Sequence, residues 1–135
     1  MKHIGAPRKP EFVLDENMAG SIVVRIRQAG LPVNAFTDLF DCGLPDEALL
    51  EKLATRPNLF LVTKDSDFRY KPAVKQALLM YSVGVFVITS GGNKSGAMLA
   101  DLIISAWPRL VKFTQKYPRP FVAKITSDAR VIVHG

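Results

Sequence analysis

Two aspartates, Asp65 and Asp67, stand one residue apart directly after the apolar run at residues 59–63. Asp15 follows a shorter apolar run at residues 12–14, and Asp46 lies between these two regions. Carboxylates brought together can share a hard divalent cation, which prefers oxygen ligands. The chemistry open to these acids therefore depends on whether the elements that carry them bring them to one place.

Two of these acids, Asp15 and Asp65, follow apolar runs that predict strands. Residues 12–14 predict a short buried strand, and residues 59–63 and 83–89 are continuous apolar runs typical of strands buried on both faces of a parallel sheet. A weaker pattern at residues 32–37 predicts another strand, followed by a loop at residues 38–44.

Helices are predicted between these strands. Apolar residues recur at helical spacing from Ser21 until Gly30, and a basic helix is expected at about residues 72–82. Pro45 opens another helix with Asp46 and Glu47 in its first turn, where acids also serve simply to favour a helix start.

The last part of the chain predicts a long apolar helix and a hairpin. The helix includes residues 98–106, and Pro108 is expected to end or kink it, with residues 109–117 continuing as helix. Residues 121–126 and 130–134 predict the hairpin.

Alternating strands and helices predict an α/β fold of three layers, α/β/α, with a mostly parallel sheet and a C-terminal β-hairpin at about residues 120–135. Residues 1–10 read as a loose basic arm, and residues 11–135 as one domain. In such sheets, sites form beyond the carboxyl ends of the strands where the strand order reverses. We therefore expect the acids to meet at one edge of the sheet; they are Asp15, Glu16, Asp46, Asp65 and Asp67.

Composition excludes several classes of protein. The chain has 135 residues, of which 48% are hydrophobic and 22% charged, as in compact globular domains. Its apolar segments are too short or too interrupted for a membrane helix, and the N-terminus lacks the apolar core of a signal peptide. Cys42 is the one cysteine, which agrees with a cytoplasmic location, and His3 and His134 are too sparse for a His/Cys zinc site.

Charge is divided unevenly along the chain. Residues 1–68 carry 8 Lys/Arg against 10 Asp/Glu, a net charge of −2, whereas residues 69–135 carry 10 against 2, a net charge of +8. An acidic site beside a basic surface suits a polyanionic substrate. The alternative is an ordinary solvated helix face, formed by Arg109, Lys112, Lys116 and Arg119.

The predicted carboxylate cluster needs a cation, because four or five acids repel one another strongly in a cleft. Without nearby histidines or thiols, such an oxygen-only set suits Mg²⁺ or Mn²⁺. A partly hydrated ion of this kind can orient water for attack on a phosphodiester.

The loop at residues 91–96, Gly-Gly-Asn-Lys-Ser-Gly, joins a predicted strand to a predicted helix. Its spacing does not match the glycine and lysine positions of a nucleotide-binding P-loop. It is read as a plain turn whose backbone amides, with Asn93 and Lys94, are candidates to bind a phosphate group.

Three segments together resemble the PIN-like domains, especially the compact bacterial branch with D-E-N and T-x-D-x-D-F motifs. They are Phe-Val-Leu-Asp-Glu-Asn at residues 12–17, Pro-Asp-Glu at residues 45–47 and Leu-Val-Thr-Lys-Asp-Ser-Asp-Phe at residues 61–68. The resemblance covers roughly residues 11–90. It implies an endoribonuclease dependent on Mg²⁺ or Mn²⁺, often the VapC-type toxin of a type II toxin–antitoxin pair.

The resemblance also implies roles for individual residues. Asp15, Asp46 and Asp65 correspond to the acidic catalytic and metal site, Asp67 is the adjacent acid, and Thr63 is the hydroxyl residue before them. All four aspartates are expected to hold the metal and activate water, with Glu16 as a further metal ligand. Longer PIN domains take an additional acid from a helix in the middle of the chain, which has no sure counterpart here; Glu16 and Glu47 are the candidates. The candidate substrate-binding residues are Thr63, Lys64, Asn93 and Lys94.

Two other functions remain open. One is a catalytically inactive PIN-like module that works through a protein or RNA partner. The other is a receiver-like phospho-acceptor, which would need a later strand ending in lysine, whereas residues 83–92 end in Thr-Ser-Gly-Gly. The expected partners are RNA, an antitoxin and a second copy of the chain, with no membrane.

Overall fold

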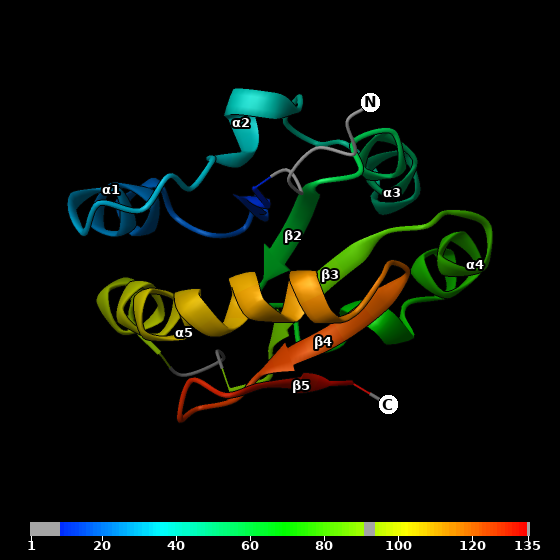
Figure 1. Cartoon of the computed structure of the whole chain (residues 1–135). Coiled ribbons are helices and arrows are strands. Elements are labelled where there is room, and N and C mark those ends of the chain that lie inside the picture. Colours follow the sequence, from blue (N-terminus) through cyan, green and yellow to red (C-terminus); the bar gives the residue numbers. More distant parts are fainter. Residues whose placement is uncertain (1–8, 91–93, 135) are drawn as a thin grey trace, which may run out of the picture.

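A computed structural model describes residues 9–90 and 94–134. Within these residues, five strands form one sheet in the order of the sequence. The first four run parallel, and the last pairs antiparallel with the fourth (Figure 1). The strands are β1 (Glu11–Leu14), β2 (Leu59–Thr63), β3 (Gly84–Ile88), β4 (Phe121–Ile125) and β5 (Val131–Val133).

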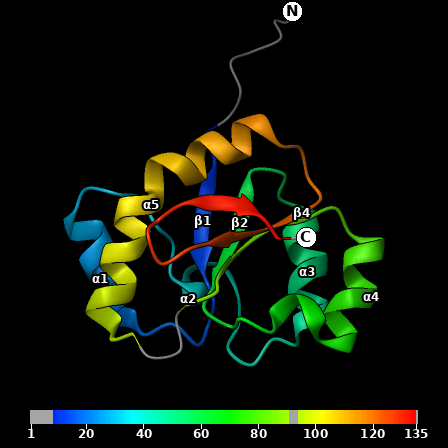
Figure 2. The same cartoon turned by 90° about the horizontal axis from the view of Figure 1, so that it is seen from below.

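Helices cover both faces of this sheet. The helical elements are α1 (Gly20–Gln28), α2 (Phe36–Leu39), α3 (Asp46–Ala54), the 3₁₀ turn η1 (Phe68–Tyr70), α4 (Pro72–Met80) and α5 (Gly96–Lys116). One face packs against α1 and α5, and the other against α3 and α4, which Figure 2 shows to left and right of the strands. The predicted three-layer α/β fold with a mostly parallel sheet is confirmed.

Alternate residues of the strands enter two separate cores. Phe12, Phe60 and Phe86 point to the α1/α5 side, whereas Val13 and Leu61 point to the α3/α4 side. All residues of β2 and β3 are buried, as the continuous apolar runs predict. Burial on both faces fixes the positions at which these strands end, and hence the residues that follow them.

The strand predicted at residues 32–37 is wrong. Asn34 makes only an isolated parallel bridge to Val13, and the next residues enter α2 instead. The carboxylate of Asp38 accepts a hydrogen bond of 2.9 Å from the backbone N–H of Ala35, which favours a helix start over an extended chain. Asn34 lies beside β1 on one edge, and β2 pairs with β1 on the other. The strand order therefore still reverses at β1, as at the sites of other open parallel sheets.

Helix α5 continues through Pro108, so of the two predicted effects of this proline, an end of the helix is wrong. Figure 2 shows its yellow first half and orange second half running in different directions, as a proline kink predicts. Although α5 has 21 residues, no helix in the described residues is both long and apolar enough to span a membrane.

The predicted hairpin at the C-terminus is confirmed, and it also extends the main sheet because β4 pairs in parallel with β3. The predicted basic helix is α4, which ends two residues earlier than expected. The basic arm predicted at residues 1–10 falls mainly on residues 1–8, which lie outside the described residues, as do residues 91–93 of the predicted loop.

Candidate active site

The acids that follow β1 and β2 lie side by side at the carboxyl edge of the sheet. Residues Leu14 and Val62 are paired in register, and the N–H of Asp15 donates to the carbonyl of Val62 at 2.9 Å. Asp65 follows β2, and Asp46 is the first residue of α3. All three aspartates line one hollow of about 280 Å³.

Thr63, the last residue of β2, links two of these acids. Its hydroxyl donates a hydrogen bond of 2.7 Å to Oδ2 of Asp15 and accepts one of 3.1 Å from the N–H of Asp65. The side chain is fully buried, so no solvent competes for either bond. Thr63 does not itself line the hollow, but its hydroxyl fixes the positions of two acids that do.

Asp15 lies in an environment that disfavours its charged form. Burial raises the pKa of its carboxyl group, and repulsion from Asp46 adds to that effect. Hydrogen bonds from Thr63 and from the N–H of Glu16, together with the charge of Lys71, lower the pKa but only in part. A further cation near Asp15 is therefore electrostatically favoured.

Lys71, which no sequence motif singles out, lies among these acids. Its ammonium lies 2.6 Å from Oδ2 of Asp65 and 3.4 Å from Oδ2 of Asp46, and it also lines the hollow. The hydrogen bond to Asp65 is the largest cause of a raised Lys71 pKa, so the side chain is a firm cation at neutral pH. In the sequence, Lys71 is marked only by its position directly before Pro72. The turn η1 that brings Lys71 back to the acids leaves no periodic pattern from which it could be predicted.

Three further acids differ in their relation to the hollow. Glu16 lines it, and both of its carboxylate oxygens accept from the N–H of Gly43 at 3.0 Å. Asp67 donates its N–H to Oδ1 of Asp65 at 3.1 Å, but it does not line the hollow. Glu47 is exposed one residue after Asp46 and does not line it either.

The predicted basic residues do not join the acids in the hollow. Lys64 is half-buried on the turn after β2, outside the lining. Lys94 lines a second hollow of about 500 Å³ between α5 and the turn of the β4–β5 hairpin, together with Arg109 and Asp128. Asn93 lies outside the described residues.

The donor set of the acidic hollow fits a hard divalent cation in chemical type, since its charged ligands are carboxylates. Between residues 9 and 134, apart from 91–93, no group of three or more His, Cys, Asp or Glu is arranged to hold a metal ion. Two of the three aspartates instead share the ammonium of Lys71. The acids are thus of the right chemical type for a metal ion, but in this arrangement Asp46 and Asp65 pair with the ammonium of Lys71.

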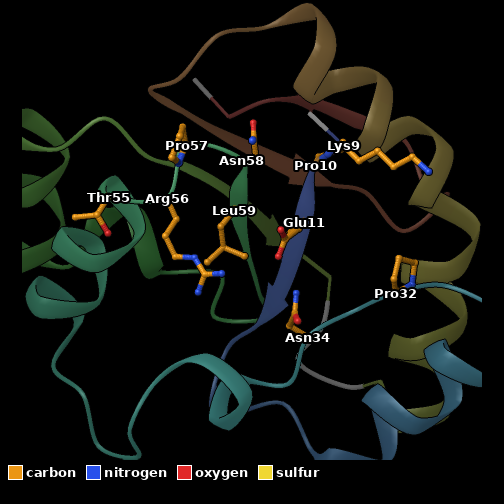
Figure 3. A pocket seen from close by; sticks show the side chains of 10 residues that line it. All are labelled: Lys9, Pro10, Glu11, Pro32, Asn34, Thr55, Arg56, Pro57, Asn58 and Leu59. Atoms are coloured by element: carbon orange, nitrogen blue, oxygen red, sulfur yellow. The ribbon is translucent and has the colours of Figure 1, made fainter. Parts of the chain in front are cut away.

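A larger hollow, of about 730 Å³, lies at the opposite, amino ends of β1 and β2 (Figure 3). Its charged lining mixes Lys9 and Arg56 with one carboxylate, Glu11. Ligands of open parallel sheets bind at the carboxyl ends of the strands. The smaller acidic hollow is therefore the better candidate for a catalytic site.

Comparison with known proteins places this geometry in a family. The sequence model of a family described as "PIN like domain" matches residues 10–90, which is more than half of the chain and includes β1 to β3 and every acid of the hollow. Searches of the curated proteins and of the solved structures found no significant match. On the strength of the family match, the chain belongs to the PIN-like domain family.

Proposed function

We propose that this protein is a metal-dependent endoribonuclease that hydrolyses RNA phosphodiester bonds. The single observation that carries the proposal is the meeting of Asp15, Asp46 and Asp65, from three separate elements, around one hollow at the carboxyl edge of the sheet. PIN-like domains are generally nucleases, and this hollow contains the carboxylates that such an activity needs.

Asp15, Asp46 and Asp65 are the proposed ligands of Mg²⁺ or Mn²⁺, with Glu16 as a further acid beside them. Such an ion, when bound, supplies an activated water and neutralises charge that develops on the phosphodiester. Thr63 holds the Asp15 carboxylate in one orientation, which reduces the reorganisation needed when substrate binds. Asp67 supports Asp65 through its backbone N–H rather than through its carboxylate.

The excess of basic residues in the second half of the chain supports binding of RNA. Residues 69–135 carry 10 Lys/Arg against 2 Asp/Glu. Lys64 lies on the turn next to the acids. Lys94 and Arg109 line a separate hollow, which both acids of that half, Asp101 and Asp128, also line. Cations placed beside an anionic catalytic centre attract the phosphates that the centre itself repels.

We further propose a cytoplasmic toxin of a type II toxin–antitoxin pair, with an antitoxin protein as its partner. A homodimer is also proposed, because Ile132 and Val133 expose apolar side chains on the edge strand β5. A small DNA-binding antitoxin encoded next to this gene would support the toxin role, and its absence would count against it.

The nuclease proposal is tested by incubating the purified protein with RNA in Mn²⁺ or with a chelator. Cleavage is expected in Mn²⁺ alone, and Asp65→Asn is expected to abolish it while the circular dichroism spectrum stays unchanged. Asp67→Asn is the matched control, because its carboxylate lies on the same turn but outside the hollow. Equal cleavage by wild type and Asp65→Asn would refute the assignment of Asp65 to the catalytic site.

A second function, a catalytically inactive PIN-like binding module, is favoured by one observation. The ammonium of Lys71 already neutralises part of the acidic hollow without any metal. Calorimetry separates the two functions: a protein that binds no Mn²⁺ at millimolar concentration is the binding module, and one that binds Mn²⁺ fits the nuclease.

A further inference from the structure

We propose that Lys71 is a resident counter-cation of the acidic hollow, and that a divalent ion must displace its ammonium from Asp65 and Asp46. This inference rests on the proposed function, because it concerns the same carboxylates. It adds a residue outside the acidic motifs that sets how readily the site takes up metal.

The geometry of the ion pairs supports direct competition. The ammonium lies 2.6 Å from Asp65 Oδ2, a short charge-assisted contact, and 3.4 Å from Asp46 Oδ2. A hard cation coordinates carboxylate oxygens at about 2.0–2.6 Å and carries two charges of the same sign as the ammonium. The two cations cannot share these oxygens without strong mutual repulsion at short range.

The backbone around Lys71 is fixed, while its side chain has room to leave. The N–H of Phe68 donates to the carbonyl of Asp65 at 3.0 Å, and the fully buried Phe68 ring anchors η1. The N–H of Lys71 donates to the carbonyl of Phe68 at 3.3 Å, and α4 begins at the next residue, Pro72. Because 43% of the Lys71 side chain is exposed, its flexible stem can turn the ammonium into solvent without moving either element.

The carboxylates also explain why the chain keeps a cation at this position. Asp15, Asp46 and Asp65 repel one another when the hollow holds no other charge, and burial makes the charged form of Asp15 still less favourable. Lys71 relieves that repulsion before metal arrives. The inference therefore predicts opposite effects of removing the ammonium: weaker stability without metal and tighter binding of metal.

The test is Mn²⁺ binding, measured by calorimetry on wild type, Lys71→Met and Lys71→Gln. The control is Lys75→Met, which removes a lysine one turn later in α4 that makes no ion pair within the described residues. Lys71→Met is expected to bind Mn²⁺ about tenfold more tightly than wild type, and Lys75→Met to bind within about twofold of it. Thermal unfolding in a chelator should show a lower Tm for Lys71→Met than for Lys75→Met.

The outcomes separate this inference from the proposed function. If wild type and both Lys71 variants bind Mn²⁺ with equal affinity, or the variants bind it more weakly, the competition is refuted while the metal site stands. If none of the proteins binds Mn²⁺, both the inference and the metal-dependent function are refuted. Lys71→Gln gives the same comparison should Lys71→Met fail to fold.

Discussion

The hydroxyl of Thr63 donates a 2.7 Å hydrogen bond to Oδ2 of Asp15, although the two residues lie 48 positions apart in the sequence. The bond joins the ends of the neighbouring parallel strands β1 and β2. The same hydroxyl accepts from the N–H of Asp65, so one buried atom orients both strand-end acids. Loss of that atom is the simplest way to disturb the hollow without removing a carboxylate.

Thr63→Val keeps the shape of the side chain and removes the hydroxyl. It leaves the N–H of Asp65 without its acceptor and should lower the free energy of unfolding by about 1–3 kcal/mol. Because the lost hydrogen bond had also lowered the Asp15 pKa, RNA cleavage should fall as well. Urea unfolding and the Mn²⁺ cleavage assay check both effects. Thr63→Ser retains the hydroxyl, and a Ser variant as inactive as the Val variant would argue against this role.

Asp15→Asn should change stability in a way that depends on pH. Since the folded protein raises the Asp15 pKa, ionisation of this group costs stability, and the cost is absent below the ordinary carboxyl pKa of 3.8. The cost in stability appears as pH rises through the raised pKa that Asp15 has in the folded protein. In a chelator, Asp15→Asn should therefore be more stable than wild type at pH 7, and the difference should vanish near pH 3. Urea midpoints across that range measure it.

Asp101→Asn should show the opposite sign. The hydrogen bond from Arg25, 2.9 Å from Asp101 Oδ1, lowers the Asp101 pKa. The ion pair stabilises the folded protein above the ordinary carboxyl pKa. This stabilisation is lost as pH falls through the lowered pKa of Asp101. Asp101→Asn should thus be slightly less stable than wild type at pH 7 and equal to it in strong acid, because both groups of this ion pair are exposed. A variant more stable than wild type at pH 7 would contradict this sign.

Arg119 is expected to be the most important polar side chain for stability away from the hollow. Its guanidinium donates to the carbonyls of Ser82, Arg56 and Leu53 at 3.1, 2.8 and 3.0 Å. These bonds tie the segment before β4 to the end of α3 and to the residues before β3. Arg119→Met should lower the free energy of unfolding by about 2 kcal/mol, because three carbonyls lose a charged donor. Arg109→Met, which loses one longer bond to Ala129, is the control and should cost less.

The sequence predicted those parts of the fold that depend on strong local patterns. The apolar runs at residues 59–63 and 83–89 became buried parallel strands, and Pro45 opened the helix that carries Asp46. The prediction of a strand at residues 32–37 was wrong because its apolar pattern was weak and because the Asp38 carboxylate accepts a local hydrogen bond from the N–H of Ala35. A side-chain bond of that kind overrides a short run of apolar residues.

For the candidate site, the sequence indicated which acids could meet but not how their charges are balanced. Asp15, Asp46 and Asp65 follow strands or open a helix, positions that share one edge of a parallel sheet. Lys71 reaches them only because η1 turns the chain back after β2. Asp67 could not be separated from Asp65 by spacing alone, since the direction of each side chain depends on that turn.

Whether carboxylates from separate elements act as one catalytic site can be decided at the start of α3. Asp46 lines the acidic hollow, whereas its neighbour Glu47 is exposed outside it. The measurement is the initial rate of RNA cleavage in Mn²⁺ by Asp46→Asn and by Glu47→Gln, each compared with wild type. A single shared site predicts a loss of about a hundredfold or more for Asp46→Asn and a nearly unchanged rate for Glu47→Gln. Cleavage by Asp46→Asn at the wild-type rate would contradict it.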